Sequence, residues 1–225
     1  MQTDTNMPAT DNNTSDSLEG SITPEANAYA QSKAQLLSRM HKTKGARFAA
    51  HDRLSKRHYA NGYTVSILSF YVICISVGLL IYSKEIDPSL ANILTFTSVA
   101  LSVLIIIISL LVASEKYDVK STLMHFCGRE VLDLYTELKF KEVDSSQLEV
   151  YRKKYQDIIN KYPDNHDELD RKLYLKAENQ IKGADYWITN LMYIWNIWGI
   201  NAIYMTLPIW IILAWVWLSV PSQSG

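Results

Sequence analysis

Two long stretches without a charged residue constrain this chain more than any other feature. The first covers residues 63–83 and holds 21 residues, and the second covers residues 90–113. About 20 apolar residues in a helix suffice to cross the hydrocarbon core of a bilayer, which is roughly 30 Å thick. Because only residues 84–89 separate the two stretches, the two helices must run antiparallel. The sequence therefore predicts an all-α integral membrane protein with a transmembrane helical hairpin over residues 63–113.

Basic residues flank the predicted hairpin unevenly. Residues 33–62 carry eight Lys and Arg against a single acid, Asp52, whereas the connecting turn carries only Lys84. Lys116 and Lys120 follow the second stretch. Cytoplasmic segments next to membrane spans are enriched in Lys and Arg. We therefore expect a multi-pass protein with the N-terminus and both ends of the hairpin in the cytoplasm.

The two segments before the hairpin differ in composition. Residues 1–24 are polar and lack the apolar surface that would offset backbone ordering, so we expect a disordered tail. Residues 25–62 are helical in composition and strongly basic, which predicts a basic amphipathic helix. Such a helix fits two environments, the anionic surface of the inner leaflet or the protein's own cytoplasmic helices.

Residues 114–185 form a charged region with helical periodicity. Apolar residues recur every three or four positions over residues 119–138, which indicates that the second span continues inward as an amphipathic helix. A further helix is expected to begin with Ser145 or Ser146 as its N-cap and to stop at Pro163. We therefore expect a cytoplasmic helical region here.

Asn165 and Glu168 mark the start of one more cytoplasmic helix. The spacing of three residues between a capping residue and an acid resembles a capping box. The apolar residues Leu169 and Leu173 then follow at helical spacing. The sequence therefore predicts a helix that starts close to Asn165.

Residues 186–220 are apolar and rich in tryptophan. If Trp198 and Trp215 mark opposite interfaces, they are separated by about 25 Å along a helix, which matches a bilayer. Pro208 would kink such a helix without excluding it. We expect a third transmembrane helix in this segment; the alternative is a re-entrant or interfacial segment.

Small and hydroxyl residues form a stripe on each predicted span. Such stripes let membrane helices approach closely and hydrogen-bond, so they either pack the helices together or, after oligomerisation, line a narrow pore. The two spans contain no Asp, Glu, Lys or Arg, which argues against a proton relay or an ion-coupled transporter. The candidate pore-lining or helix-packing residues are Ser69, Ser76, Thr95, Ser98, Ser102 and Ser109.

The sequence contains no arrangement of residues that is typical of an enzyme. The glycines are scattered rather than gathered in a phosphate-binding loop. His166 and Asp167 are adjacent, but a metal site needs further ligands at compatible spacing, and only His125 precedes them nearby. With a net charge of −1, nothing indicates direct binding of nucleic acid. We therefore expect no catalysis, metal or cofactor.

Several short segments occur along the chain in a familiar order. A basic run over residues 47–54 precedes the hairpin, and Ser114-Glu115-Lys116-Tyr117 and His125-Phe126-Cys127 follow it. A Tyr-rich helix that includes Tyr155 then leads to the segment Asn165-His166-Asp167-Glu168-Leu169-Asp170. Over about residues 35–180 this order resembles the SLATT domain, the two-transmembrane effector domain associated with SMODS and SLOG proteins. The most specific part is the set Tyr155, Asn165, His166 and Asp170.

The resemblance implies a membrane effector of bacterial anti-phage conflict systems. Such an effector would lie in the bacterial inner membrane, form a homo-oligomer, and open a pore or perturb the bilayer. Its trigger would be a nucleotide second messenger or a signal-generating partner protein, from a nucleotidyltransferase or reverse-transcriptase system. The alternative is a non-conducting membrane anchor whose cytoplasmic helices recruit a soluble enzyme. The Trp-rich C-terminal segment departs from a plain two-span pattern.

Overall fold

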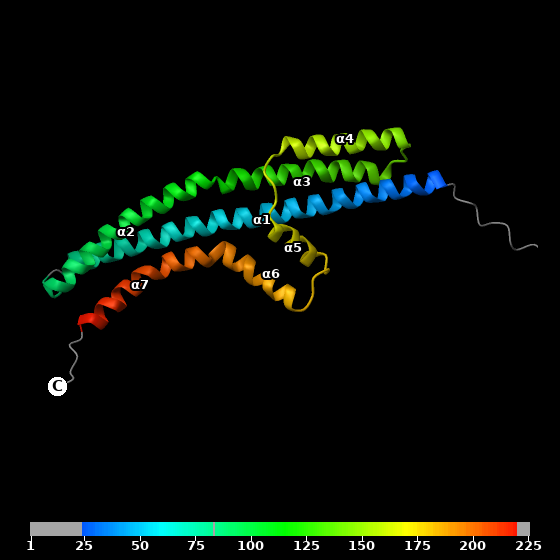
Figure 1. Cartoon of the computed structure of the whole chain (residues 1–225). Helices are drawn as coiled ribbons and strands as arrows, with labels where there is room; N and C mark the ends of the chain where they lie inside the picture. Colours follow the sequence, from blue (N-terminus) through cyan, green and yellow to red (C-terminus); the bar gives the residue numbers. More distant parts are fainter. Residues whose placement is uncertain (1–23, 83, 220–225) are drawn as a thin grey trace, which may run out of the picture.

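One very long helix organises the molecule. The computed structural model describes residues 24–82 and 84–219, so the expected tail lies outside the described residues apart from Pro24. Helix α1 (Pro24–Ile81) has 58 residues and runs along most of the molecule (Figure 1). At 1.5 Å per residue it is about 87 Å long. The predicted basic helix and the predicted first span are therefore one uninterrupted helix.

Helices α2 (Pro88–Glu115) and α3 (Tyr117–Phe140) run back along α1 and form most of its contacts. The Asp87 carboxylate caps the start of α2, because it accepts hydrogen bonds from the N–H groups of Ser89 and Leu90. The antiparallel hairpin predicted from the short connection is thus present, with its turn at one end of the molecule.

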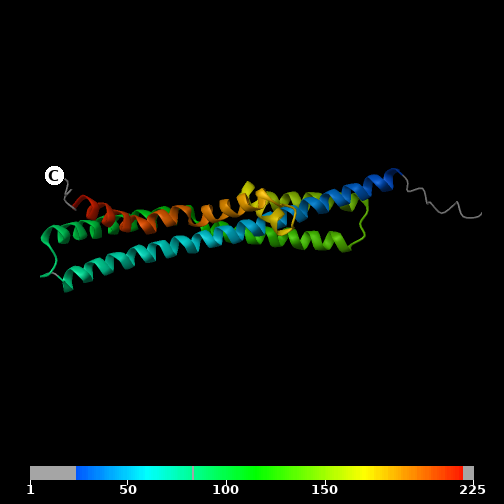
Figure 2. The same cartoon turned by 90° about the horizontal axis from the view of Figure 1, so that it is seen from below.

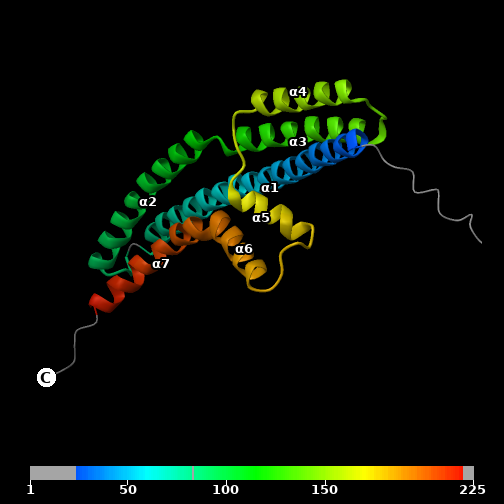
Figure 3. The same ribbon diagram turned by 45° about the vertical axis from the view of Figure 1, so that its right-hand side comes forward.

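Lys116 interrupts the path from α2 to α3. Its φ of 50° and ψ of 44° place it in the left-handed region, which costs a non-glycine residue roughly 1–2 kcal/mol. The second apolar helix does continue into the charged region as expected, but with a bend at this residue (Figure 3). The apolar helix α2 and the charged helix α3 therefore differ in direction, whereas α1 remains one helix.

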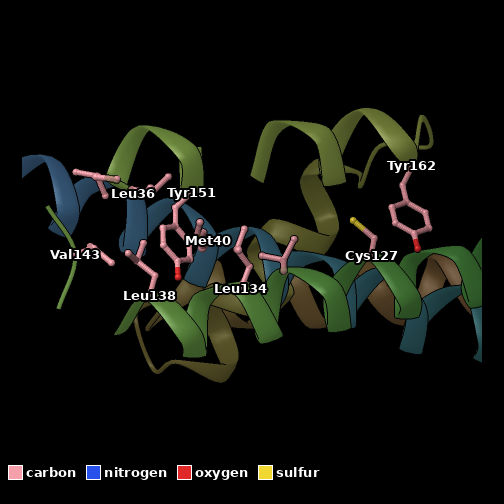
Figure 4. Packing of buried hydrophobic residues seen from close by; sticks show 10 residues of the cluster. Leu36, Met40, Cys127, Leu134, Leu138, Val143, Tyr151 and Tyr162 are labelled. Atoms are coloured by element: carbon pink, nitrogen blue, oxygen red, sulfur yellow. The ribbon is translucent and has the colours of Figure 1, made fainter. Parts of the chain in front are cut away.

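Helix α4 (Ser145–Lys161) packs against α1 and α3 to form the main apolar core. Its N-cap is Asp144 rather than Ser145 or Ser146, because the Asp144 carboxylate accepts the Gln147 N–H at 2.7 Å. The core combines side chains from all three helices and from the loop before α4 (Figure 4). Its buried members are Leu36, Met40, Cys127, Val131, Leu134, Leu138, Val143, Leu148, Tyr151 and Tyr162.

Helix α5 (Glu168–Ala177) crosses the other side of α1. Its N-cap is Asp167, so the prediction that Asn165 caps this helix is wrong. The side-chain oxygen of Asn165 instead accepts the N–H of its neighbour His166 at 2.9 Å, in the turn before the helix. Gly45 allows the close approach of α5, because a Cβ there would lie only 2.1 Å from the Tyr174 ring.

The C-terminal segment is one continuous helical path in three parts: α6 (Ala184–Ile194), the π-helical η1 (Trp195–Gly199) and α7 (Ile200–Ser219). Helix α7 lies beside α1 and α2 and ends near the hairpin turn (Figures 1 and 2). Tyr204 of α7 packs against the hairpin core. That a membrane-spanning helix exists in this segment stays a prediction, but the segment is helical and follows the hairpin.

The hairpin exposes most of its apolar surface. Its interface holds the buried residues Leu68, Leu101 and Ile108. Two helices of the described chain are long and apolar enough to cross a membrane, and only 11% and 17% of their most apolar windows are buried. A core helix of a soluble protein would be mostly buried, so the outward-facing apolar surface of these two helices suits a lipid environment.

Candidate functional site

A buried arginine lies at the centre of the polar contacts between α1 and the C-terminal half of the chain. Arg53 of α1 is only 4% exposed. A buried charge needs a partner and hydrogen bonds, because the interior solvates it poorly. Arg53 occupies the face of α1 that also carries the buried Ala50 and Leu54, one helical turn or less away. The position is therefore part of the packed interior and not of the solvated basic surface.

Asp170 of α5 is the principal partner of Arg53. Its carboxylate is fully buried and receives two hydrogen bonds from the guanidinium, from Nε to Oδ1 at 2.7 Å and from Nη2 to Oδ2 at 2.9 Å. The Asp167 N–H also donates to Oδ2 at 2.8 Å. This planar two-point contact is the strong form of the arginine–carboxylate pair. It holds the start of α5 against α1.

Two further groups complete the shell around Arg53. Nη2 donates to the exposed Asp167 carboxylate at 2.6 Å, and Nη1 donates to the side-chain oxygen of Asn196 at 3.1 Å. Burial lowers the pKa of Arg53, but the hydrogen bonds and charges of Asp170 and Asp167 outweigh it, so the pKa is raised. One side chain thus joins α1, α5 and η1, and we name Arg53, Asp167, Asp170 and Asn196 the arginine cluster.

A second buried arginine fixes the loop before α5. Arg47 donates to the Asp164 carbonyl and, at 2.9 Å, to the Met124 sulfur. Two residues further on, the Nδ1 atom of His166 is buried without a hydrogen-bond partner among the described residues. Burial and then the positive charge of Arg47 lower the pKa of His166. The loop therefore favours neutral His166.

Contacts on either side of the arginine cluster tie the C-terminal segment to α1. At the exposed side, Lys56 donates to Asp52 at 2.8 Å and to the Tyr193 hydroxyl at 2.9 Å, and these hydrogen bonds raise its pKa. Toward the apolar half, the Asn201 side chain donates to the Asn61 oxygen at 3.0 Å, and both residues are buried. The path from α6 to α7 is thus joined to α1 at three successive levels.

The π-helical geometry of η1 accompanies two of these contacts. Asn196 lies within it and Asn201 follows it by two residues. Gly199 is buried, and a Cβ there would come within 2.7 Å of the Trp195 ring. Single-turn π segments in helices frequently occur at functional sites. Here the π-helical segment places the Asn196 amide in the arginine cluster, and the Asn201 amide, two residues after the segment, bonds to Asn61.

The residues of the most specific sequence motif do not form one site. Asp170 lies in the arginine cluster, and His166 lies in the loop beside Arg47. Asn165 is exposed, and Tyr155 is on α4, where its hydroxyl meets the Thr43 hydroxyl at 2.8 Å. Of the four, Tyr155 joins α4 to α1 and Asp170 joins α5 to α1, whereas Asn165 and His166 lie in the loop between them.

Neither Arg53 nor Asn196 is among the site residues predicted from the sequence, and the reason is physical. Arg53 is one of eight basic residues in residues 33–62, and only its spacing of three residues from Ala50 signals that it faces inward. Asn196 sits in an apolar segment, where a buried amide is expensive unless it is hydrogen-bonded. That isolated amide is the signal that could have indicated a polar partner.

The hydroxyl stripes divide between two surfaces. Ser69, Ser98 and Ser102 are partly buried, whereas the other three candidates, Ser76, Thr95 and Ser109, are exposed. Ser76 and Ser98 face each other across the hairpin with their hydroxyls 3.4 Å apart. Several of these hydroxyls donate to a carbonyl one turn earlier in their own helix, as Thr95 does to Ala91 at 2.8 Å. Part of the stripe packs the hairpin, and part remains available on its outer surface.

The described residues contain no group of three His, Cys, Asp or Glu side chains placed to hold a metal ion. The carboxylates of Asp167 and Asp170 accept hydrogen bonds from the Arg53 guanidinium, and Asp170 also accepts one from the Asp167 N–H, so the cluster orients α5 on α1.

Comparison with known proteins agrees with the resemblance noted from the sequence. Residues 30–215 match the family model described as SMODS and SLOG-associating 2TM effector domain family 5. No curated protein and no solved structure matches the chain at a significant level. The matched region includes η1 and most of α7, so the Trp-rich segment lies inside the family's domain and not beyond it.

Replacing Asp170 by Asn tests the role of the arginine cluster in stability. The change removes the carboxylate and leaves a buried guanidinium without its main partner, which costs about 3–5 kcal/mol of unfolding free energy. Asp167→Asn is the matched control: the Asp167 side chain is 68% exposed, and Asn also caps helices well, so its cost is below about 1 kcal/mol. Chemical unfolding followed by circular dichroism in detergent measures both. Equal costs would contradict the assignment.

The lowered pKa of His166 predicts a pH dependence of stability. The unfolded chain binds a proton at this residue near its ordinary pKa of about 6.5, while the folded protein resists that proton. Stability from this residue is therefore present above that pH and is lost as the pH falls below it. Thermal melts at pH 7 and pH 5 should show a smaller loss for His166→Asn than for the natural chain. His58→Asn, at an exposed position of α1, should leave the loss unchanged.

Proposed function

The chain belongs to the SMODS and SLOG-associating 2TM effector domain family 5, and we propose that it forms a homo-oligomeric pore in the bacterial inner membrane during phage infection. In this proposal a nucleotide signal or a signal-generating partner protein acts on the cytoplasmic helices α3, α4 and α5. The hairpins of several copies then rearrange and dissipate the membrane gradient. The family itself describes a membrane effector domain of conflict systems, and the pore, the oligomer and the trigger are the steps proposed beyond it.

The continuity of α1 is the observation that carries the proposal. Its first half holds the arginine cluster and the main core, and its second half forms one side of the apolar hairpin. A helix without a break transmits a shift or rotation at one end to the other end. The other arm of the hairpin, from α2 to α3, is interrupted at Lys116. A signal received by the cytoplasmic helices therefore has a direct mechanical route to the hairpin through α1.

The outer surface of the hairpin supports assembly. It presents large apolar side chains such as Phe96, Ile106 and Leu110, with the exposed hydroxyls of Thr95 and Ser109 between them. Small and hydroxyl residues favour close contact between membrane helices. On oligomerisation these two hydroxyls would meet neighbouring hairpins or border a pore. Orientation with both hairpin ends in the cytoplasm follows from the basic flanks.

A third membrane helix fits the same arrangement. The 20 residues of α7 span about 30 Å, the thickness of the hydrocarbon core. Its start is held at the level of Asn61, where the apolar part of α1 begins, and its end lies near the hairpin turn. In the proposed topology α7 therefore crosses the bilayer next to the hairpin, which places the C-terminus on the outer side.

One observation favours a non-conducting anchor as the second candidate function. Thr95 and Ser102 donate their hydroxyls to carbonyls of their own helix, so these groups are satisfied without water. An anchor would use them only for packing, and its cytoplasmic helices would recruit a soluble enzyme. Conduction separates the two functions.

The outer hydroxyls provide the test of conduction. Thr95→Leu combined with Ser109→Leu makes the outer stripe apolar, and Val99→Leu combined with Val103→Leu alters exposed positions of the same helix that are already apolar. Each chain is induced with its neighbouring genes, the cells are infected, and membrane potential is followed with a voltage-sensitive dye. We expect collapse with the natural chain and the Val control, and a preserved potential with the Thr95/Ser109 variant, which should still cross-link as an oligomer.

Two outcomes would contradict the pore. Growth arrest of the natural chain at unchanged potential would favour the anchor. Loss of cross-linking in the Thr95/Ser109 variant would assign the outer stripe to packing.

Gly62 provides the test of transmission along α1. Apart from the neighbouring residues and the backbone of α1 itself, no atom lies within 4 Å of a Cβ built at this position, so Ala is sterically accommodated. Gly62→Pro removes a helical hydrogen bond and kinks α1 between its two halves at a cost of about 3 kcal/mol, whereas Gly62→Ala strengthens the helix. We expect the Pro variant to reach the membrane fraction but not to collapse the potential on infection. A Pro variant as active as the Ala variant would rule out transmission through α1.

A further inference from the structure

A cavity of about 330 Å³ lies where α1, the end of α2, and η1 with α7 meet. Its polar side is formed by Arg57 and Glu115, and its apolar side by residues such as Ile108, Ile200 and Tyr204. Ligand cavities in proteins begin at about this volume. Charged and apolar side chains both line this cavity, whereas the hairpin interface beside it is a packed apolar core.

The cavity crosses the level at which the apolar stretches begin. Arg57 precedes the first charge-free stretch and Glu115 follows the second, so both lie at the cytoplasmic edge in the proposed orientation. Ile108 is seven residues before Glu115, about 10 Å deeper along α2. Trp195, at the boundary between α6 and η1, also lines the cavity. An amphiphile with a polar head and an apolar tail would match this gradient.

The two charges at the polar side are open to a ligand. The Arg57 guanidinium stacks over the Tyr117 ring, with its carbon 4.8 Å from the ring centroid, and no carboxylate of the described residues forms an ion pair with it. Glu115 has only a long contact to Lys120, at 3.5 Å, and both side chains are well exposed. Such exposed pairs hold their partners weakly. One cation and one anion are therefore available side by side around Tyr117.

The charges that line an adjoining cavity of about 270 Å³ indicate which net charge of a ligand is disfavoured. This cavity shares Arg57, Glu115 and Tyr117 with the first, and its wall also carries Lys120, Asp164 and the two carboxylates of the arginine cluster. Arg53 is already satisfied by those carboxylates, so it adds no free positive charge. With Lys120 counted, the wall of this cavity holds four carboxylates against three cations, and the surplus negative charge opposes a headgroup with a net negative charge.

We propose that this cavity binds the headgroup and upper acyl chain of a zwitterionic phospholipid with a primary ammonium, phosphatidylethanolamine. Arg57 binds the phosphate, the ammonium donates hydrogen bonds to Glu115, and an acyl chain lies along Ile108, Ile200 and Tyr204. The inference rests on the membrane insertion proposed above and adds a ligand to it. A headgroup with a quaternary ammonium has no N–H to donate to Glu115, and an anionic headgroup supplies no cation for it.

The site gives the lipid a place between α2 and α7. These two helices have few direct contacts with each other, and the cavity lies between them. A bound lipid would fill that space next to the Asn61–Asn201 hydrogen bond. The lipid would therefore help to hold the C-terminal helix on the hairpin.

Lipid retention by the full chain tests the proposal. The protein is purified in a mild detergent, exchanged into nanodiscs of equimolar phosphatidylethanolamine, phosphatidylcholine and phosphatidylglycerol, and re-extracted for native mass spectrometry. We expect one retained phosphatidylethanolamine per chain, about tenfold preferred over the other two, as for one charge-assisted hydrogen bond. Glu115→Gln should abolish the preference over phosphatidylcholine, and Arg57→Ala should reduce retention of both. The exposed substitutions Glu142→Gln and Arg129→Ala serve as controls.

The outcomes separate this site from the proposed function. Equal retention of the three lipids, preference for phosphatidylglycerol, or variants that behave like their controls would overturn the lipid site. Ile200→Trp, which fills the apolar side of the cavity, should lower retention while leaving both charges in place, and unchanged retention would also count against it. Membrane potential measured on the same natural chain reports on the pore independently.

Discussion

The burial of Arg53 is the interaction on which the arrangement of the C-terminal half depends. Its guanidinium is held by Asp170 and reaches Asn196, so α5 and the start of the Trp-rich path have defined places on α1. Replacing Asp170 leaves the Arg53 guanidinium, which is only 4% exposed, without its main partner, and replacing Asn196 removes the link from Arg53 to η1. The cluster therefore selects one arrangement of helices among the several that an apolar core alone would tolerate.

The apolar half of the molecule obeys a different constraint. In lipid, backbone groups must be satisfied within each segment, which favours uninterrupted helices and puts the breaks elsewhere. The bend at Lys116 follows the second charge-free stretch, and the π turn at Trp195–Gly199 interrupts the Trp-rich segment just before α7. The buried amides Asn61 and Asn201 lie at the same level. This junction is where the helices of the charged region, the hairpin and the candidate lipid cavity meet.

Sequence reasoning located the hairpin, the helices of the charged region and the family, because charge-free length and helical periodicity are local properties. It placed helix starts less well. Asp144 and Asp167 take the N-cap positions expected for Ser145 or Ser146 and for Asn165, since neighbouring polar residues compete for the same backbone N–H groups. Of the candidate site residues, only Asp170 belongs to the arginine cluster. Arg53 lies 117 positions before Asp170, and Asn196, which also accepts from Arg53, lies 26 positions after it, so no local pattern connects the three residues.

The sequence by itself determined that the chain has two charge-free helices joined by a short turn, with basic residues on one side. Two charge-free stretches of about 20 residues joined by six residues leave few alternatives to an antiparallel helical hairpin. Only the tertiary structure decided which of the basic residues is buried, that α1 is one helix from end to end, and that the Trp-rich segment returns along the hairpin. Burial depends on which faces meet, and a helix face acquires its partner only when distant segments pack together.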